Sequence, residues 1–324
     1  MLHKLSVAPM MGCTDRHCRF LFRLLSPRAM LYSEMKTTSA LIHGDSDRLL
    51  KHTDDSPCGV QLGGSNPEAL AIAARMIEDA GYQEVNLNCG CPSDRVQQGD
   101  IGACLMAEPG LVADCYAAIS SSVTIPVTIK SRIGIDNLDS FDFFDAFISK
   151  IYQAGCRTFH VHARKAILTG LSPKENREIP PLKYDYVREI RQRYPDAAFS
   201  LNGGIKDATT TLQLLEEFDG VMLGRAPYAN PYLLNELDQT IFNGEARDRF
   251  EVMMQYILYA EKEHTKGTHI KHMAKHLLGL FTGMPGARAF RRHLSTHMHK
   301  DIANAGVIRD AAAFINEDVS ETAS

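Results

Sequence analysis

The fold is decided by four short runs: PVTIKSR at 126–132, TFHVHAR at 158–164, AFSLNGG at 198–204 and GVMLGRA at 220–226. Each run is apolar and β-forming, and each leads through a turn into a stretch of helical period. Four similar runs come earlier: LSVAPM at 5–10, AMLYSEM at 29–35, CGVQLGG at 58–64 and EVNLNCG at 84–90. Eight strands that alternate with helices predict an α/β fold, a (β/α)8 TIM barrel built on a parallel sheet.

One helix shows the alternation most clearly. The stretch PEALAIAARMIEDAG at 67–81 places Pro67 in the first helical turn and ends at Gly81. Its apolar residues recur at helical spacing. The four that we expect on the buried face are Ala69, Ile72, Ala73 and Met76.

The last quarter of the chain has a different pattern. Beyond residue 240 the period-2 runs stop, and RDRFEVMMQYILYAEKEH at 247–264 has the spacing of an amphipathic helix. We therefore predict a catalytic barrel over residues 1–240 and a C-terminal helical domain over residues 241–324. From Lys262 to Lys300 this tail carries eight Lys and Arg residues against one acid, Glu263.

Composition limits the possible classes of protein. The chain has 324 residues, 44% hydrophobic and 23% charged, so it can bury a core without disulfides. Its 35 Lys and Arg against 39 Asp and Glu give a formal charge of −4, so a polyanionic partner must meet a local basic patch. The basic tail is such a patch, although a solvated helix face has the same composition.

The cysteines and the start of the chain predict a cellular location. Eight cysteines are scattered along the chain, which opens MLHKLSVAPM without the apolar region of a signal peptide. No apolar run approaches the roughly 18 residues that cross a bilayer. We predict a reduced, cytoplasmic protein with no membrane association and no obligate protein partner.

Two glycine turns predict a phosphate site. Asn202, Gly203 and Gly204 follow the seventh strand, and Gly224 and Arg225 follow the eighth. Glycines let main-chain N–H groups close around an anion, and these two loops are the usual phosphate site of the fold. Arg225 can add a bidentate contact. A phosphate-bearing ligand or cofactor is expected, unless the glycines only make tight turns.

Two cationic side chains end the neighbouring strands. Lys130 and His162 suit a cofactor that gains negative charge, as a reduced flavin does at its N1 and O2 edge. Other interpretations remain open. Lys130 could form a Schiff base, and His160 with His162 could bind a metal. His160 could also be a packing residue.

Cys91 lies in the turn after the fourth strand. Gly90 allows an unusual backbone angle and Pro92 fixes the exit, so the thiol can be aimed into the barrel mouth. A protonated thiol there can act as a proton donor. It could instead be a nucleophile, or bind a metal together with Cys89. The thiols that we expect only to pack are Cys58, Cys104, Cys115 and Cys156.

Together these residues resemble the dihydrouridine synthase family, flavin enzymes that reduce uridine in transfer RNA. Two stretches resemble the bacterial branch that acts on D-loop positions 20 and 20a: PSDRVQ at 92–97, and GLSPKENR at 170–177 leading to IPPL at 179–182. The other matching motifs are Ala8-Pro9-Met10 with Thr14-Asp15, Ser33-Glu34-Met35, Gln61-Leu62, Asn88-Cys89-Gly90-Cys91-Pro92, Lys130-Ser131-Arg132, His160-Val161-His162-Ala163-Arg164, Asn202-Gly203-Gly204 and Gly224-Arg225.

The resemblance implies a cofactor and a set of contacts. The cofactor is FMN, re-reduced by NADPH. The residues implied to hold FMN are Ala8, Pro9, Met10, Gln61, Lys130, His162, Asn202, Gly203, Gly204, Gly224 and Arg225. The residues implied to contact tRNA are Asn88, Lys174, Arg177, Arg288 and Arg291.

The implied reaction reduces the C5=C6 bond of uracil. Hydride passes from reduced FMN to C6, and Cys91 gives a proton to C5. Two other functions remain open: an FMN-dependent reductase of a free pyrimidine or small enone, which needs no basic tail, and an aldolase that uses Lys130. One residue departs from the pattern, because Cys89 stands where this branch commonly has an apolar residue.

Overall fold

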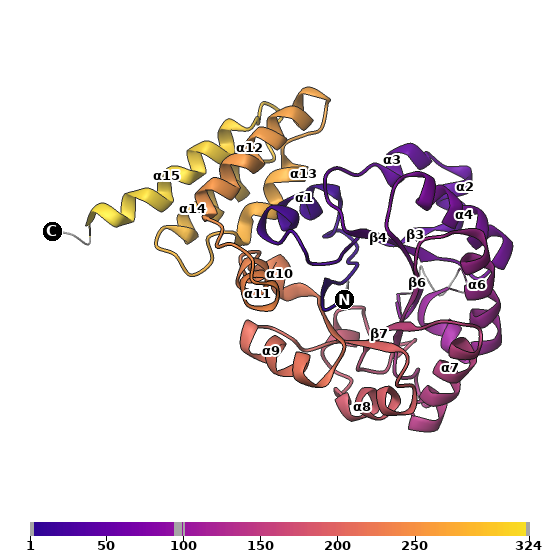
Figure 1. Cartoon of the computed structure of the whole chain (residues 1–324). Coiled ribbons are helices and arrows are strands. Elements are labelled where there is room, and N and C mark those ends of the chain that lie inside the picture. Colours follow the sequence, from indigo (N-terminus) through magenta and orange to yellow (C-terminus); the bar gives the residue numbers. More distant parts are fainter. Residues whose placement is uncertain (1–2, 94–98, 100, 322–324) are drawn as a thin grey trace. The chain divides into compact units, whose positions relative to one another are not determined.

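The computed structural model describes residues 3–93, 99 and 101–321 (Figure 1). They form two compact units. The first comprises Met1–Gly12 and Ala29–Gly224, and the second comprises Cys13–Arg28 and Arg225–Ser324. Within the described ranges, no helix is both long and apolar enough to cross a membrane.

The first unit is the predicted parallel barrel, and each of the eight predicted strands is confirmed. The sheet runs in the order β1-β9-β8-β7-β6-β5-β4-β2, and β3 (Lys36–Thr37) pairs with β4 beside this path. Hydrogen bonds from Val7 N to Met30 O and from Met30 N to Leu5 O, both 2.9 Å, join β1 to the start of β2. The barrel strands are β1 (Leu5–Val7), β2 (Leu31–Tyr32), β4 (Cys58–Gly63), β5 (Glu84–Cys89), β6 (Val127–Arg132), β7 (Thr158–His162), β8 (Ala198–Asn202) and β9 (Gly220–Leu223).

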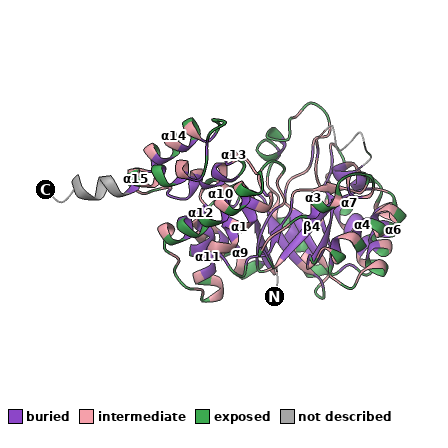
Figure 2. Ribbon diagram, turned by 90° about the horizontal axis from the view of Figure 1, so that it is seen from above, coloured by how far each residue is buried: buried purple, intermediate pink, exposed green. Residues whose placement is uncertain are grey.

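Helices surround this sheet, and Figure 2 shows the strands buried between them. The helix predicted at 67–81 is α4 (Pro67–Asp79), but its buried face is shifted by one residue. Ile72 is 42% exposed, whereas the buried residues are Leu70, Ala73, Ala74 and Ile77. The other elements of this layer are α2 (Thr38–His43), α3 (Ser46–Leu50), η1 (Gly102–Ala107), α6 (Pro109–Ser122), α7 (Phe141–Gln153), η2 (Glu175–Arg177), α8 (Tyr184–Arg193) and α9 (Ala208–Glu217).

The second unit is helical. The amphipathic helix predicted at 247–264 is α12 (Arg249–Thr265), which buries Val252, Met253, Tyr256 and Ile257 among others. The remaining elements of this unit are α1 (Arg16–Leu25), α10 (Arg225–Ala229), α11 (Leu233–Phe242), α13 (Lys271–Ala274), η3 (Lys275–Gly279), α14 (Ala287–His297) and α15 (Gly306–Glu321).

The division into units differs from the boundary that the sequence predicts at residue 240. The helical unit begins at Arg225 and also takes in α1. The reason is packing: the ring of Phe20 on α1 stacks on Tyr259 of α12 with centroids 4.0 Å apart. Asp15, which caps α1, pairs with Lys275 at 3.0 Å. The first helix after β1 therefore belongs, by its contacts, to the helical unit.

Candidate active site

The turn that carries Cys91 is held by Asn88. Asn88 Oδ1 accepts hydrogen bonds from the main-chain N–H groups of Gly90 (2.9 Å) and Cys91 (3.0 Å). The Cys91 side chain is partly exposed, and its Sγ lies 3.5 Å from Ser93 Oγ. A partly exposed thiol on a fixed turn can present its proton to a ligand.

Arg132, the last residue of β6, fixes the same turn from the neighbouring strand. Its Nε donates to Gly90 O at 3.0 Å, and its Nη1 donates to the carbonyls of Lys165 and Asn176, both at 2.9 Å. Burial lowers the pKa of Arg132 to about 10, so the group stays cationic at neutral pH. This charge beside Cys91 was not among the predicted site residues. Its place two residues after Lys130, on the same face of the strand, is the signal that could have found it.

Lys130 meets Asn202 inside the barrel. Lys130 Nζ donates to Asn202 Oδ1 at 3.3 Å, and Asn202 Nδ2 donates to Met222 O at 2.7 Å. Burial, together with the nearby charge of Arg132, lowers the pKa of Lys130 to about 8. The pKa of Lys130 thus lies close to neutral pH, and an anion that binds beside the lysine would favour its protonated form.

His162 packs against the first of the paired glycines. A Cβ on Gly203 would come within 2.6 Å of His162 Cδ2. Burial, and the neighbouring charges of Arg132 and Lys130, lower the pKa of His162 well below its ordinary value. The imidazole is therefore neutral, so the prediction of a second cation beside Lys130 is wrong at His162, because burial disfavours its charged form.

The predicted phosphate loops have the required backbone. Gly203 and Gly204 adopt φ of 113° and 76°, the left-handed region that other residues avoid. A Cβ on Gly224 would meet no atom of the described residues within 4 Å. Packing does not explain glycine at 224, whereas close approach of a ligand to the main chain would. These loops, with Lys130, fit the phosphate and the anionic edge of a flavin.

The other predicted cofactor residues lie after β1, on β4 and after β9. Ala8 N donates to Leu223 O at 2.7 Å, so the segment Ala8-Pro9-Met10 runs beside the end of β9. Gln61 on β4 is buried, and its Oε1 accepts from Asn88 Nδ2 at 2.8 Å. Arg225 is exposed and opens α10 as the first residue of the helical unit.

The remaining thiols of the first unit are mostly buried. All eight cysteines are free. Cys89 is fully buried, and burial raises its pKa well above the ordinary value. Cys89 is thus a packing residue. Cys58, Cys115 and Cys156 are buried as predicted, and Cys104 is partly exposed.

His160 turns away from a metal site shared with His162. Its Nε2 lies 2.9 Å from the hydroxyl of Tyr32. In the part of the chain that the structure describes, the one group with metal-ligand geometry is His3, Glu84 and His160. Glu84 Oε2 lies 2.5 Å from His3 Nε2, so two members of this group are already paired with each other.

The predicted RNA contacts fall on both units. Lys174 and Arg177 are exposed at η2, a loop that the buried Asn176 ties to Ile167 through bonds of 2.7 and 2.9 Å. The stretch 94–97 of the predicted branch motif lies outside the described residues.

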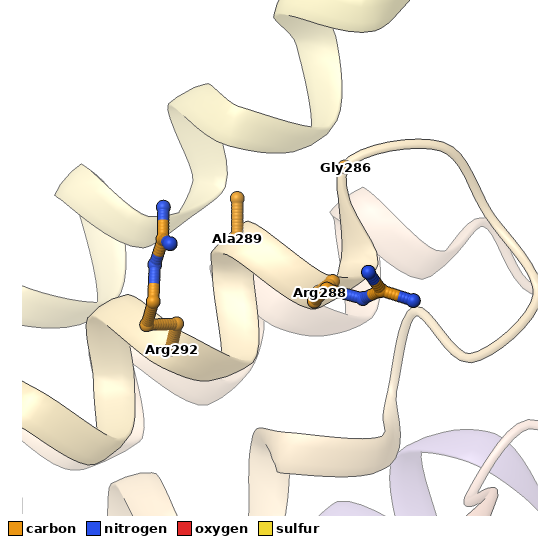
Figure 3. Close-up of a pocket in the computed structure, with 4 residues that line it drawn as sticks. All are labelled: Gly286, Arg288, Ala289 and Arg292. Carbon is orange, nitrogen blue, oxygen red and sulfur yellow. The ribbon is translucent and has the colours of Figure 1, made fainter.

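The helical unit offers an arginine-lined hollow. Arg288 and Arg291 are exposed on α14. A surface cavity of about 330 Å³ is lined by Gly286, Arg288, Ala289 and Arg292 (Figure 3). Arg292 was not among the predicted contacts. Arg288 and Arg292 are one helical turn apart, and in Figure 3 their guanidinium groups point away from each other.

The fold and the site define a (β/α)8-barrel enzyme that fits a phosphate-bearing cofactor. Among solved structures, 2-naphthoyl-CoA reductase with 2-naphthoyl-CoA is similar with a TM-score of 0.55 at 12% identity, covering 74% of this chain and 50% of that chain. An old yellow enzyme homologue from Zymomonas mobilis is similar with a TM-score of 0.52 at 12% identity, covering 76% of this chain and 90% of that chain. These likenesses confirm the fold.

The chain belongs to the family described as Dihydrouridine synthase (Dus), whose sequence pattern matches residues 6–316. Similar proteins include the tRNA-dihydrouridine(20/20a) synthase of Vibrio cholerae, 51% identical over 315 residues, 96% of each chain. That of Pseudomonas putida is 53% identical over 300 residues, 92% of this chain and 89% of the relative. The predicted resemblance is confirmed, and membership implies a flavin cofactor.

Proposed function

We propose that this protein reduces uridines 20 and 20a in the D-loop of tRNA, with FMN as its flavin and NADPH as the reductant. The observation that carries the proposal is the Cys91 turn. A partly exposed thiol is held there by Asn88 and Arg132, at the barrel end where Lys130 and the paired glycines lie. The names of relatives about half identical over nearly the full chain support the same substrate.

The chain's own residues suit the protonation step. A uridine must leave the stacked RNA to enter a barrel mouth, at a cost of a few kcal/mol that phosphate contacts offset. Cys91 then holds its proton at Sγ for transfer to C5 of the ring. The Arg132 cation near this thiol stabilises the thiolate that remains after transfer.

The cofactor residues have a separate task. When bound, a reduced flavin supplies the hydride that C6 of the uracil ring takes up. Gly203, Gly204 and Gly224 would receive its phosphate, and Lys130 would face the edge of the ring system that becomes negative.

Binding of tRNA falls to the basic groups. Lys174 and Arg177 at η2, and Arg288 and Arg291 on α14, are exposed, and cations at the surface can bind phosphates. Asn88 would contact the uridine itself. Its amide is already engaged by the Cys91 turn, so this contact would place the base next to the thiol. A tRNA substrate also supports a cytoplasmic location.

Family membership favours this reaction over the two alternatives, a reductase of a free pyrimidine or small enone and a Lys130 aldolase. The lowered pKa of Lys130 suits a Schiff base as well as a flavin site, so it does not separate them. Trapping by borohydride with a carbonyl substrate would identify an aldolase.

The test is mass-spectrometric mapping of unmodified tRNA incubated with the protein, FMN and NADPH. We expect a gain of two hydrogens in the D-loop fragment that contains positions 20 and 20a. The Cys91→Ala variant should bind FMN normally and turn over roughly 10²–10⁴-fold more slowly, the usual contribution of a positioned acid. Cys89→Ala, which removes the buried thiol two residues away, is the matched control and should retain wild-type turnover. Equal turnover of both variants would overturn the assignment of Cys91.

A further inference from the structure

A continuous hydrogen-bonded chain runs along the inside of the barrel. Strand β5 turns Glu84, Asn86 and Asn88 inward at alternate positions, and all three are buried. Asn88 Nδ2 donates to Gln61 Oε1, Gln61 Nε2 donates to Asn86 Oδ1, and Asn86 Nδ2 donates to Thr128 Oγ1, each at 2.8 Å. Thr128 Oγ1 then donates to Glu84 Oε1 at 2.6 Å.

Two hydroxyl groups and one histidine nitrogen surround the carboxylate at the end of this chain. Tyr32 OH and Thr128 Oγ1 both donate to Glu84 Oε1 at 2.6 Å, and His3 Nε2 lies 2.5 Å from Oε2. Glu84 Oε1 accepts from both hydroxyls, while Thr128 Oγ1 also receives an N–H of Asn86 at 2.8 Å. The Thr128 hydroxyl must therefore donate its single proton to the hydrogen bond with Glu84.

That single choice fixes every amide above it. With its proton committed, Thr128 can only accept, so Asn86 must present its NH2 group. Gln61 must then present NH2 to Asn86 and its oxygen to Asn88. Asn88 is left with its oxygen toward the Cys91 turn, where the N–H groups of Gly90 and Cys91 can only donate. Both ends of the chain demand the same direction, and reversing any amide would set donor against donor or acceptor against acceptor.

We infer that Thr128 and Glu84 are positioning residues. They give the buried NH2 group of Asn86 its acceptor, and so hold Gln61 and, through Asn88, the Cys91 turn in place. This inference rests on the proposed function, in which Gln61 meets the flavin and Cys91 protonates the uracil. Without the Thr128 hydroxyl, the buried NH2 group of Asn86 would lose its acceptor, and Asn86 could turn and withdraw the oxygen to which Gln61 donates. The chain removes that freedom before any ligand binds.

The test compares Thr128→Val, which keeps the shape but loses the hydroxyl, with Thr128→Ser, which keeps the hydroxyl. In the flavin-loaded protein without tRNA, we expect Thr128→Val to shift the visible absorption spectrum of the flavin. We also expect it to change the rate at which Cys91 is alkylated by at least about threefold. With tRNA, kcat should fall about tenfold or more. Thr128→Ser should have the flavin spectrum of the wild type, and its alkylation rate and kcat should remain within twofold of the wild-type values. The alkylation signal is assigned to Cys91 by its loss in Cys91→Ala.

A folded Thr128→Val that matches the wild type in spectrum, alkylation rate and kcat would overturn the inference. Glu84→Gln gives a second test that does not depend on the stability of that variant. The new amide can turn an NH2 group toward Thr128, which a carboxylate cannot do, so we expect kcat to fall at least about threefold. A folded Glu84→Gln that matches the wild type in flavin spectrum, alkylation rate and kcat would also overturn the inference. Absence of any hydrogen gain in tRNA with the wild type would defeat the proposed function alone, because spectrum and alkylation are measured without RNA.

Discussion

At Lys130, one titration controls the charge of the cofactor site. Its pKa of about 8 lies below the ordinary 10.5, because the group is buried and near Arg132. A bound anion favours the protonated form, so FMN binding above pH 8 must take up a proton. We expect the dissociation constant of FMN to rise as pH passes from 7 through 8 to 9.5, by up to tenfold per unit. Lys130→Met should bind FMN more weakly and without this rise. A parallel rise in Lys130→Met would assign the titration to another group.

The same shift has a consequence for stability with the opposite sign. The folded pKa lies below the unfolded one, so between pH 8 and 10.5 the unfolded chain holds more protons at this residue. The contribution of Lys130 to the free energy of unfolding therefore becomes more favourable as pH rises through that window.

Arg132 joins three segments through main-chain carbonyls. Arg132→Lys keeps the charge but cannot reach the oxygens of Gly90, Lys165 and Asn176 together. Each buried carbonyl left without a donor costs about 1–3 kcal/mol. We expect a clear loss in the free energy of unfolding, measured by urea titration, and lower turnover. Arg188→Lys, on the exposed pair with Glu217, is the control and should lose less than about 1 kcal/mol. Similar losses in the two variants would contradict the role given to Arg132.

At the scale of elements, the loops after β8 and β9 can be tested as a pair. Gly203→Ala forces a side chain into left-handed backbone and to within 2.6 Å of the His162 ring, so we expect the protein to lose stability and FMN affinity together. In Gly224→Ala, the new Cβ would contact none of the described atoms, so the free energy of unfolding should stay within about 0.5 kcal/mol of the wild-type value. The affinity for FMN should fall. Unchanged FMN affinity in Gly224→Ala would remove this loop from the phosphate site.

Strands and helices could be predicted where a short stretch of sequence determines them. All eight strands follow from β-forming runs and turns, and Cys91 and Lys130 could be proposed as site residues because each lies within two residues of the end of a strand. The face of α4 was misplaced by one residue because its sequence is apolar on more than one side. Arg132 and Thr128 were missed because their importance depends on which carbonyls and amides the fold brings to them. The sequence alone does not state those partners.

At the scale of the whole molecule, the exposed positive charges are the groups that would bind the phosphates of tRNA. Lys174→Ala and Arg288→Ala should each weaken tRNA binding and reduce the slope of log affinity against log salt by about one. Lys150→Ala, an exposed lysine on α7 outside the predicted contacts, is the charge-matched control and should leave the slope unchanged. Filter binding at several salt concentrations measures all three. Equal slopes for all variants would mean that these residues do not neutralise phosphates.

Grouping α1 with the C-terminal helices has a consequence for biosynthesis. The apolar face of α1 leaves the ribosome long before α12, which supplies its partner Tyr259. The barrel, too, can close only after β9 has been made. For most of translation the nascent chain therefore exposes an apolar helix near its start, a natural site for a chaperone to hold. Synthesis of α12, rather than completion of the barrel, is the event that supplies the missing partner of α1.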